Sequence, residues 1–165
     1  GTSLDEVAER AGVTRNLVYH YFPRGRIDLY LAAMELAGEL LTADWTTDPD
    51  VPLDQRLTGN FARIVEHAME PSDAWLLYRQ ALSSSEPEVS AAGARYRTTM
   101  IESIAQNHFG TTDPPPYARL ALDAYIAFAE TALDGCRVRR LDPAVVTAML
   151  TRSLLAIVEA AREAR

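Results

Sequence analysis

The stretch LDEVAERAGVTRNLVYHYFP, residues 4–23, decides the fold of this 165-residue chain. Ser3 precedes the stretch, and Glu6 three residues later completes a capping box, which starts a helix. Gly12 permits the tight turn that ends this helix. Thr14 can then cap a second helix of about two turns, which the following proline and glycine end. Two short helices joined by a glycine turn predict a helix-turn-helix.

The side chains of this stretch divide into an inner and an outer set. Ala8 must be small because the second helix crosses close to it, and we expect Leu17 and Val18 to fill the angle between the two helices. The outer positions of the second helix carry hydrogen-bond donors suited to phosphates and base edges, and these are Arg15, Asn16, Tyr19 and His20. A helical hairpin with no role in DNA binding is the alternative interpretation of this spacing.

The charge of the chain is unevenly distributed. The net charge of −7 argues at first sight against a nucleic-acid partner, because phosphate binding needs local positive potential. The segment from Arg10 to Ile27, however, contains four arginines and no acidic residue, so the other residues together carry −11. A small basic segment on an acidic body is the pattern expected when only that segment approaches DNA.

The remainder of the chain predicts an all-α fold. Helical periodicity recurs between glycine and proline breakers, and β-branched residues nowhere alternate with polar ones over a strand's length. A long amphipathic helix is predicted from Ile27 to Trp45, followed by a breaker stretch from Thr46 to Pro52 and four or five further helices. The segments Leu120–Leu133 and Val145–Ala161 are so apolar that they need cover on two sides. A second copy of the chain is the expected cover, so we predict a homodimer.

Aromatic and methionine side chains on the later helices are candidates for the walls of a ligand pocket. Side chains of these types at helical spacing are more often simple core residues, so both interpretations stay open. Three acidic residues, Asp123, Glu130 and Asp134, share one helical face, which we interpret as a solvated stripe rather than the polar side of a pocket. The candidate pocket residues are Phe61, Trp75, Tyr78, Met100, Tyr125 and Phe128.

Several classes of function find no support in the sequence. Cys136 is the single cysteine, and the three histidines are scattered, so we expect no metal site, no intrachain disulfide and no cofactor. No nucleophile, base and orienting group occur at a recognisable spacing, which argues against an enzyme. A helical-bundle enzyme and a protein-interaction module without DNA binding remain the alternatives. Because we find no signal peptide and no apolar run approaching the roughly 18 residues of a membrane span, we expect a cytoplasmic protein without a membrane partner.

The string from Gly12 to Pro23, followed by Gly25 to Leu29, closely resembles the DNA-binding signature of the tetracycline-repressor (TetR) family. The resemblance implies a ligand-responsive transcriptional regulator, a repressor that a small apolar effector releases from double-stranded operator DNA. It further implies that the side chains at Tyr19 and His20 touch DNA backbone and bases. Arg26 stands where the family more often has a phosphate-binding lysine. The DNA-contacting residues predicted in this way are Thr14, Arg15, Asn16, Tyr19, His20 and Arg26.

The same resemblance sets the expected domains. Residues 1–30 form the helix-turn-helix domain, and residues 31–165 form a domain for ligand binding and dimerisation. Family members carry one more helix with a basic arm ahead of the segment that begins here, so the first helix of the DNA-binding domain is expected to be missing from this chain.

Overall fold

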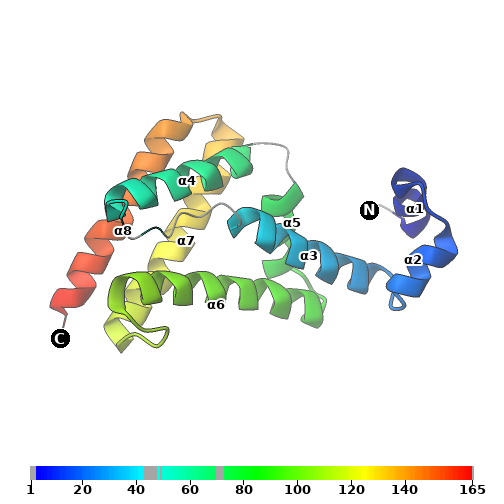
Figure 1. The fold of residues 1–165 in the computed structure, drawn as a ribbon, viewed down its shortest axis with the longest axis horizontal. Helices are drawn as coiled ribbons and strands as arrows, with labels where there is room; N and C mark the ends of the chain where they lie inside the picture. Colours follow the sequence, from blue (N-terminus) through cyan, green and yellow to red (C-terminus); the bar gives the residue numbers. More distant parts are fainter. Residues whose placement is uncertain (1–2, 43–47, 49, 70–72, 165) are drawn as a thin grey trace.

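The computed structural model describes residues 3–42, 48, 50–69 and 73–164, and these residues form eight helices and no strand. The predicted all-α fold is confirmed. Figure 1 shows α1 and α2 together at one end of the molecule, with α3 leading from them to a bundle of the other helices. The helices are α1 Leu4–Ala11, α2 Arg15–Tyr21, α3 Arg26–Thr42, α4 Leu53–Met69, α5 Asp73–Leu82, α6 Pro87–Phe109, α7 Pro116–Arg139 and α8 Pro143–Glu163.

The ends of the first two helices are set by the residues that the sequence indicated. The Ser3 hydroxyl accepts a hydrogen bond from the Glu6 amide at 3.1 Å, and the Glu6 carboxylate accepts one from the Ser3 amide at 2.7 Å. Gly12 ends α1 at a φ of +66°, a left-handed conformation that favours glycine. The Thr14 hydroxyl accepts from the Leu17 amide at 3.3 Å and so caps α2. The capping box, the glycine turn and the second cap are confirmed.

α3 connects the two ends of the molecule and is anchored to the bundle along its length. The Tyr30 hydroxyl donates to the Leu77 carbonyl of α5 at 2.8 Å. Gly38 lets the Tyr96 ring of α6 approach so closely that a Cβ there would lie 3.0 Å from a ring carbon. The helix ends at Thr42 in the structure, and Trp45, the end that we predicted, lies outside the described residues.

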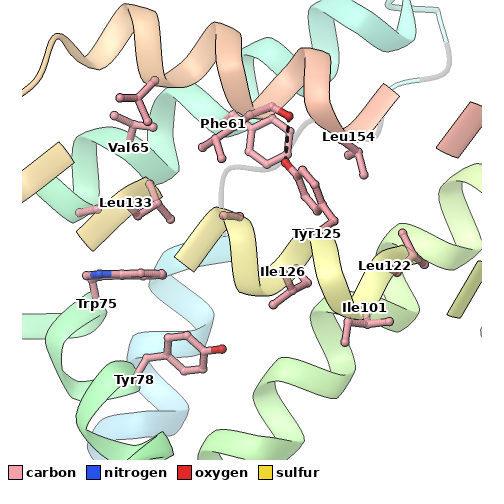
Figure 2. Packing of buried hydrophobic residues seen from close by; sticks show 14 of the residues in the cluster. Phe61, Val65, Trp75, Tyr78, Ile101, Leu122, Tyr125, Ile126, Leu133 and Leu154 are labelled. Carbon is pink, nitrogen blue, oxygen red and sulfur yellow. Dashed lines mark hydrogen bonds between the residues drawn. The ribbon is translucent and has the colours of Figure 1, made fainter. Parts of the chain in front are cut away.

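α7 runs through the bundle and packs against α4, α6 and α8. Its Tyr125 is fully buried and donates to the Leu150 carbonyl of α8 at 3.0 Å, as Figure 2 shows. Leu122 on α7 and Leu154 on α8 are also fully buried. The last three helices all begin with a proline. Proline fits the first turn of a helix because a backbone N–H at that position would have no acceptor within the helix, so its absence costs nothing.

The two apolar C-terminal helices are confirmed and are longer than predicted. Among the described residues α8 alone is long and apolar enough to cross a membrane, with a mean hydropathy of 1.6, so our expectation that no such run exists was wrong. A core helix passes the same test of length and composition. Consistent with that role, α8 buries Val146, Leu150, Leu154 and Val158 within the bundle.

Candidate DNA-binding interface and interior cavity

α1 and α2 cross at a small contact built from two residues. Ala8 and Val18 are buried, as predicted for the two sides of a helix-turn-helix crossing. Leu17 was predicted to fill the same angle, but 42% of it is exposed, so that prediction was wrong. The reason is geometric: neighbouring residues on a helix point about 100° apart, so only one of Leu17 and Val18 can face α1. Leu17 lies instead on an uncovered face with Val13 and Tyr21, which are also exposed.

The side chains predicted to contact DNA are exposed on α2 and at the start of α3. Arg15, Asn16, Tyr19 and His20 all lie at the surface of α2, and Arg26 is exposed at the first position of α3. The sixth residue, Thr14, is exposed too, and its hydroxyl caps α2. The structure thus brings five of the six into one short helix and its cap, with Arg26 on the next helix.

Two of these side chains form a preformed pair. The Arg15 guanidinium lies 5.4 Å from the centre of the Tyr19 ring, in a cation–π arrangement. Its Nε is also 3.2 Å from an Asp5 carboxylate oxygen, with both side chains about three-fifths exposed. An ion pair this open to water is weak, so Arg15 can leave Asp5 for a phosphate.

Arg24 has a role that the sequence did not reveal. We counted it in the basic segment, but its Nε lies 2.7 Å from Asp28 and its guanidinium also lies 2.6 Å from Glu88 on α6. The two partners are 4 and 64 positions away along the chain. Arg24 therefore ties the end of the helix-turn-helix to the bundle, and part of the positive charge of the segment is already balanced.

The bundle encloses a cavity of about 50 Å³. Of the six predicted pocket residues, four line it: Phe61, Trp75, Met100 and Tyr125. Tyr78 is buried beside the lining rather than in it, and Phe128 is 37% exposed and is not among the lining residues. The volume suffices for a few water molecules but is below the roughly 150 Å³ of an engineered cavity that holds benzene. A larger guest therefore requires the walls to move.

A buried ionic network borders this cavity. Glu130 of α7 is only 7% exposed, so the interpretation of Asp123, Glu130 and Asp134 as a solvated stripe was wrong for Glu130, whereas the side chains of Asp123 and Asp134 are 46% and 38% exposed. Glu130 accepts hydrogen bonds from the Tyr78 hydroxyl at 2.6 Å and from Arg79 at 3.0 Å. Arg79 also donates to Asp134 at 3.0 Å, and the Trp75 indole donates to Asp134 at 2.9 Å. Burial, and then the adjacent carboxylate, raise the pKa of Tyr78, which keeps it a donor.

Several large apolar side chains of α7 and α8 are exposed at the surface. Leu120 is 66% exposed and Val145 63% exposed, although both are large apolar residues. We call this surface the α7/α8 face and define it by Tyr117, Leu120, Phe128, Val145 and Met149, all exposed. Val145 and Met149 line one surface hollow together with Arg152, and large apolar side chains exposed in this number on two neighbouring helices indicate a candidate protein interaction site.

The remaining titratable groups suit structural roles. Cys136 is buried with its sulfur 3.4 Å from that of Met69, and burial raises the pKa of its thiol. His108 is buried at the end of α6, and burial followed by the charges of Arg162 and Arg56 lowers its pKa. The described residues contain no group of three or more histidine, cysteine or acidic side chains that could hold a metal ion.

Comparison with known proteins finds a family model and solved structures that match this chain. Residues 1–37 match the family model of the bacterial regulatory proteins of the tetR family. Over 99% of its length, the chain is similar to the crystal structure of a TetR-family transcriptional regulator from Streptomyces coelicolor. That similarity has a TM-score of 0.80 at 27% sequence identity and covers 74% of the other chain. No curated protein matches the chain in sequence.

Proposed function

We propose that this chain, a DNA-binding transcriptional regulator with the N-terminal module and the fold of the TetR family, is a homodimeric repressor that a small molecule releases from its operator. Regulators of this family bind DNA and do not catalyse a reaction, so the interpretation as a helical-bundle enzyme is set aside. In this proposal residues 1–30 read the DNA, and residues 31–165 bind the effector and the second subunit.

One observation carries the proposal for DNA: the donor-bearing side chains gather on the open face of a short helix. α2 is a seven-residue helix with an open face, and an α-helix with its side chains is about 10–12 Å across, which fits the major groove of about 12 Å. We propose that His20 lies nearest the bases, with Arg15, Asn16 and Tyr19 beside it, and that Arg26 binds a phosphate. The Thr14 hydroxyl accepts from Leu17 and keeps its own proton free to donate to a phosphate.

The α7/α8 face supports the homodimer. Two copies of this face, related by a twofold axis, would form a four-helix interface that removes Leu120 and Val145 from water. Obligate dimers typically bury on the order of 2,000 Å² or more. A twofold dimer also presents two recognition helices, which must lie roughly 34 to 36 Å apart to enter successive major grooves.

DNA binding is tested with a duplex selected by the protein from a random library and a salt titration followed by fluorescence anisotropy. Arg26→Ala should weaken binding to all sequences. It should also lower the slope of the logarithm of the binding constant against the logarithm of the salt concentration by about one unit for each phosphate contact that is lost. His20→Ala should cost roughly 1 to 3 kcal/mol for the selected duplex and little for an unrelated one.

Arg139→Ala is the matched control, because Arg139 is an exposed arginine at the far end of α7. It should leave both the affinity and the salt slope unchanged. Wild-type affinity and slope in Arg26→Ala and His20→Ala would contradict the proposed contacts.

A further inference from the structure

We propose that Arg24 positions the helix-turn-helix on the bundle through its ion pair with Glu88, and that this pair sets the spacing of half-sites that the dimer accepts. The inference rests on the proposed function, because only a dimer reads two half-sites. The accepted spacing depends on how firmly the two recognition helices are held relative to one another. Any contact that fixes the helix-turn-helix to the bundle of its own subunit therefore contributes to specificity.

The helix-turn-helix has little contact with the bundle. Figure 1 shows α1 and α2 at one end of the molecule, joined to the bundle by α3. α1 packs against α2, whereas α3, α5 and α6 pack against one another. Among the described residues, the Arg24–Glu88 pair is the only ion pair or hydrogen bond that joins residues 3–25 to a residue beyond α3. This pair is therefore a second attachment of a module that otherwise hangs on one helix.

Arg24 is held on both of its sides. It lies in the turn between α2 and α3, three residues after Tyr21, where α2 ends. Its amide donates to one carboxylate oxygen of Asp28 at 2.8 Å, and its Nε donates to the other at 2.7 Å. The side chain of Asp28 is only 16% exposed, which makes it a fixed anchor on α3. A terminal nitrogen of the same guanidinium donates to Glu88 at 2.6 Å, so one planar group joins two carboxylates in a defined geometry.

Glu88 is fixed to the bundle at the beginning of α6. It lies in the first turn of this helix, and the next residue, Val89, is buried in the core. Further along α6, Gly93 approaches α5 so closely that an added Cβ would lie 3.0 Å from the Leu82 amide nitrogen. A carboxylate in the first turn is also favoured by the helix dipole. The bundle side of the ion pair therefore belongs to a well-packed helix.

The displacement that mis-spaced DNA demands is large enough to break the ion pair. One additional base pair moves the half-sites apart by about 3.4 Å and rotates one against the other by about 35°. If the two subunits share the shift, each helix-turn-helix moves by about 1.7 Å. A contact of 2.6 Å that opens by this amount is no longer a hydrogen bond. DNA of the correct spacing keeps the pair in both subunits, whereas mis-spaced DNA breaks it.

The exposure of the pair sets the size of the effect. The side chains of Arg24 and Glu88 are 51% and 54% exposed, and an ion pair this open to water changes an equilibrium constant by up to about fivefold. The dimer contains two such pairs. Removing both should therefore lower the preference for the correct spacing by about three- to tenfold.

The test measures the affinity of the full chain for two duplexes by fluorescence anisotropy. One is the duplex that the protein selects from a random library, and the other has one base pair inserted between the half-sites. The ratio of the two dissociation constants is the spacing preference. Glu88→Gln and Arg24→Gln should each lower this ratio about three- to tenfold, and the double variant should lower it no further, because both substitutions remove one interaction. A loss of folded protein weakens both duplexes alike, so a purely structural role would leave the ratio unchanged.

Glu86→Gln is the matched control. Glu86 is an exposed acid two residues before Glu88, its side chain makes no capping hydrogen bond, and no ion pair joins it to a described residue. The control removes the same charge from the same end of α6 and should keep the wild-type ratio. A wild-type ratio in Glu88→Gln, an equal loss in Glu86→Gln, or additive losses in the double variant would overturn the proposal.

Failure of the proposed function has a different signature from failure of this inference. If the chain does not read DNA as a dimer, the wild type binds a single half-site as tightly as the selected duplex and shows no spacing preference. If the dimer forms but the ion pair has no role, the wild type prefers one spacing and Glu88→Gln keeps that preference.

Discussion

Replacing Leu120 by aspartate should dissociate the proposed dimer. Leu120 exposes 66% of its surface, and fully burying a leucine side chain contributes about 1.5–3 kcal/mol. Burial of the exposed part at an interface is therefore worth about 1–2 kcal/mol, and twofold symmetry doubles this to about 2–4 kcal/mol per dimer. Losing that contribution raises the dissociation constant by about 30- to 1,000-fold, and the two buried carboxylates raise it further.

The dissociation constant is measured by sedimentation over protein concentrations from nanomolar to high micromolar. Leu36→Asp is the matched control, because Leu36 is a leucine of similar exposure, 56%, on α3 rather than on the α7/α8 face. The control should remain a dimer, and Leu120→Asp should sediment as a folded monomer and lose tight binding to the selected duplex. A wild-type monomer at micromolar concentration, or equal dissociation constants for the two variants, would refute the interface.

Two further predictions concern stability. His108 has a lowered pKa because of burial and the nearby Arg162 and Arg56, so the folded state binds the proton less readily than the unfolded state; stability should fall as pH drops below about 6.5 toward the folded pKa. Urea unfolding at pH 7.5 and 5.5 measures this change in the free energy of unfolding. His108→Leu should lose less unfolding free energy on acidification than the wild type, and the control His20→Gln, at an exposed site, should lose as much as the wild type. Equal losses in all three proteins would contradict the prediction. Gly12→Ala should destabilise the protein by about 1 kcal/mol through backbone strain alone, since an added Cβ meets no atom within 4 Å. Gly12→Asn should cost less, because asparagine tolerates the left-handed conformation better. An unchanged melting temperature in both variants would contradict this interpretation of the turn.

The parts of the fold that depend on neighbouring residues could be predicted from the sequence. The capping box at Ser3 and Glu6, the turn at Gly12 and the cap at Thr14 each use partners no more than four residues apart, so their residue types suffice. The all-α fold and the two apolar C-terminal helices follow in the same way from periodicity. Helix ends without such local signals were predicted less accurately: α7 runs from Pro116 to Arg139, whereas the predicted apolar segment ran only from Leu120 to Leu133.

The misreadings concern residues whose surroundings come from distant parts of the chain. Glu130 is buried because Tyr78 and Arg79, about 50 positions earlier, supply donors that replace water, and no local pattern around Glu130 indicates this. Arg24 was counted among the free charges of the basic segment because its partner Glu88 lies 64 positions away and no local pattern reveals the pair. Phe128 was assigned to the pocket because it is aromatic, and it lies only about 60° around the helix from Tyr125, with the two ring centres 6.2 Å apart, but it stands at the edge of the buried face, where 37% of it is exposed.

In the proposed function, the same long-range contacts would transmit a small change in the bundle to the DNA-binding end. α3 has 17 residues and is roughly 25 Å long, so a tilt of about 5° at its bundle end moves its other end by roughly 2 Å. Arg24 holds both Asp28 on α3 and Glu88 on α6, so we expect the helix-turn-helix to follow the two helices instead of bending at the turn. In a twofold dimer the displacement occurs in both subunits, and the separation of the recognition helices changes by up to roughly twice that amount. Hydrogen bonds to base edges have little tolerance for such shifts, because donor and acceptor must stay within roughly 2.7–3.2 Å. In the proposed dimer, a movement of this size would therefore release the operator while the fold of each subunit remains unchanged.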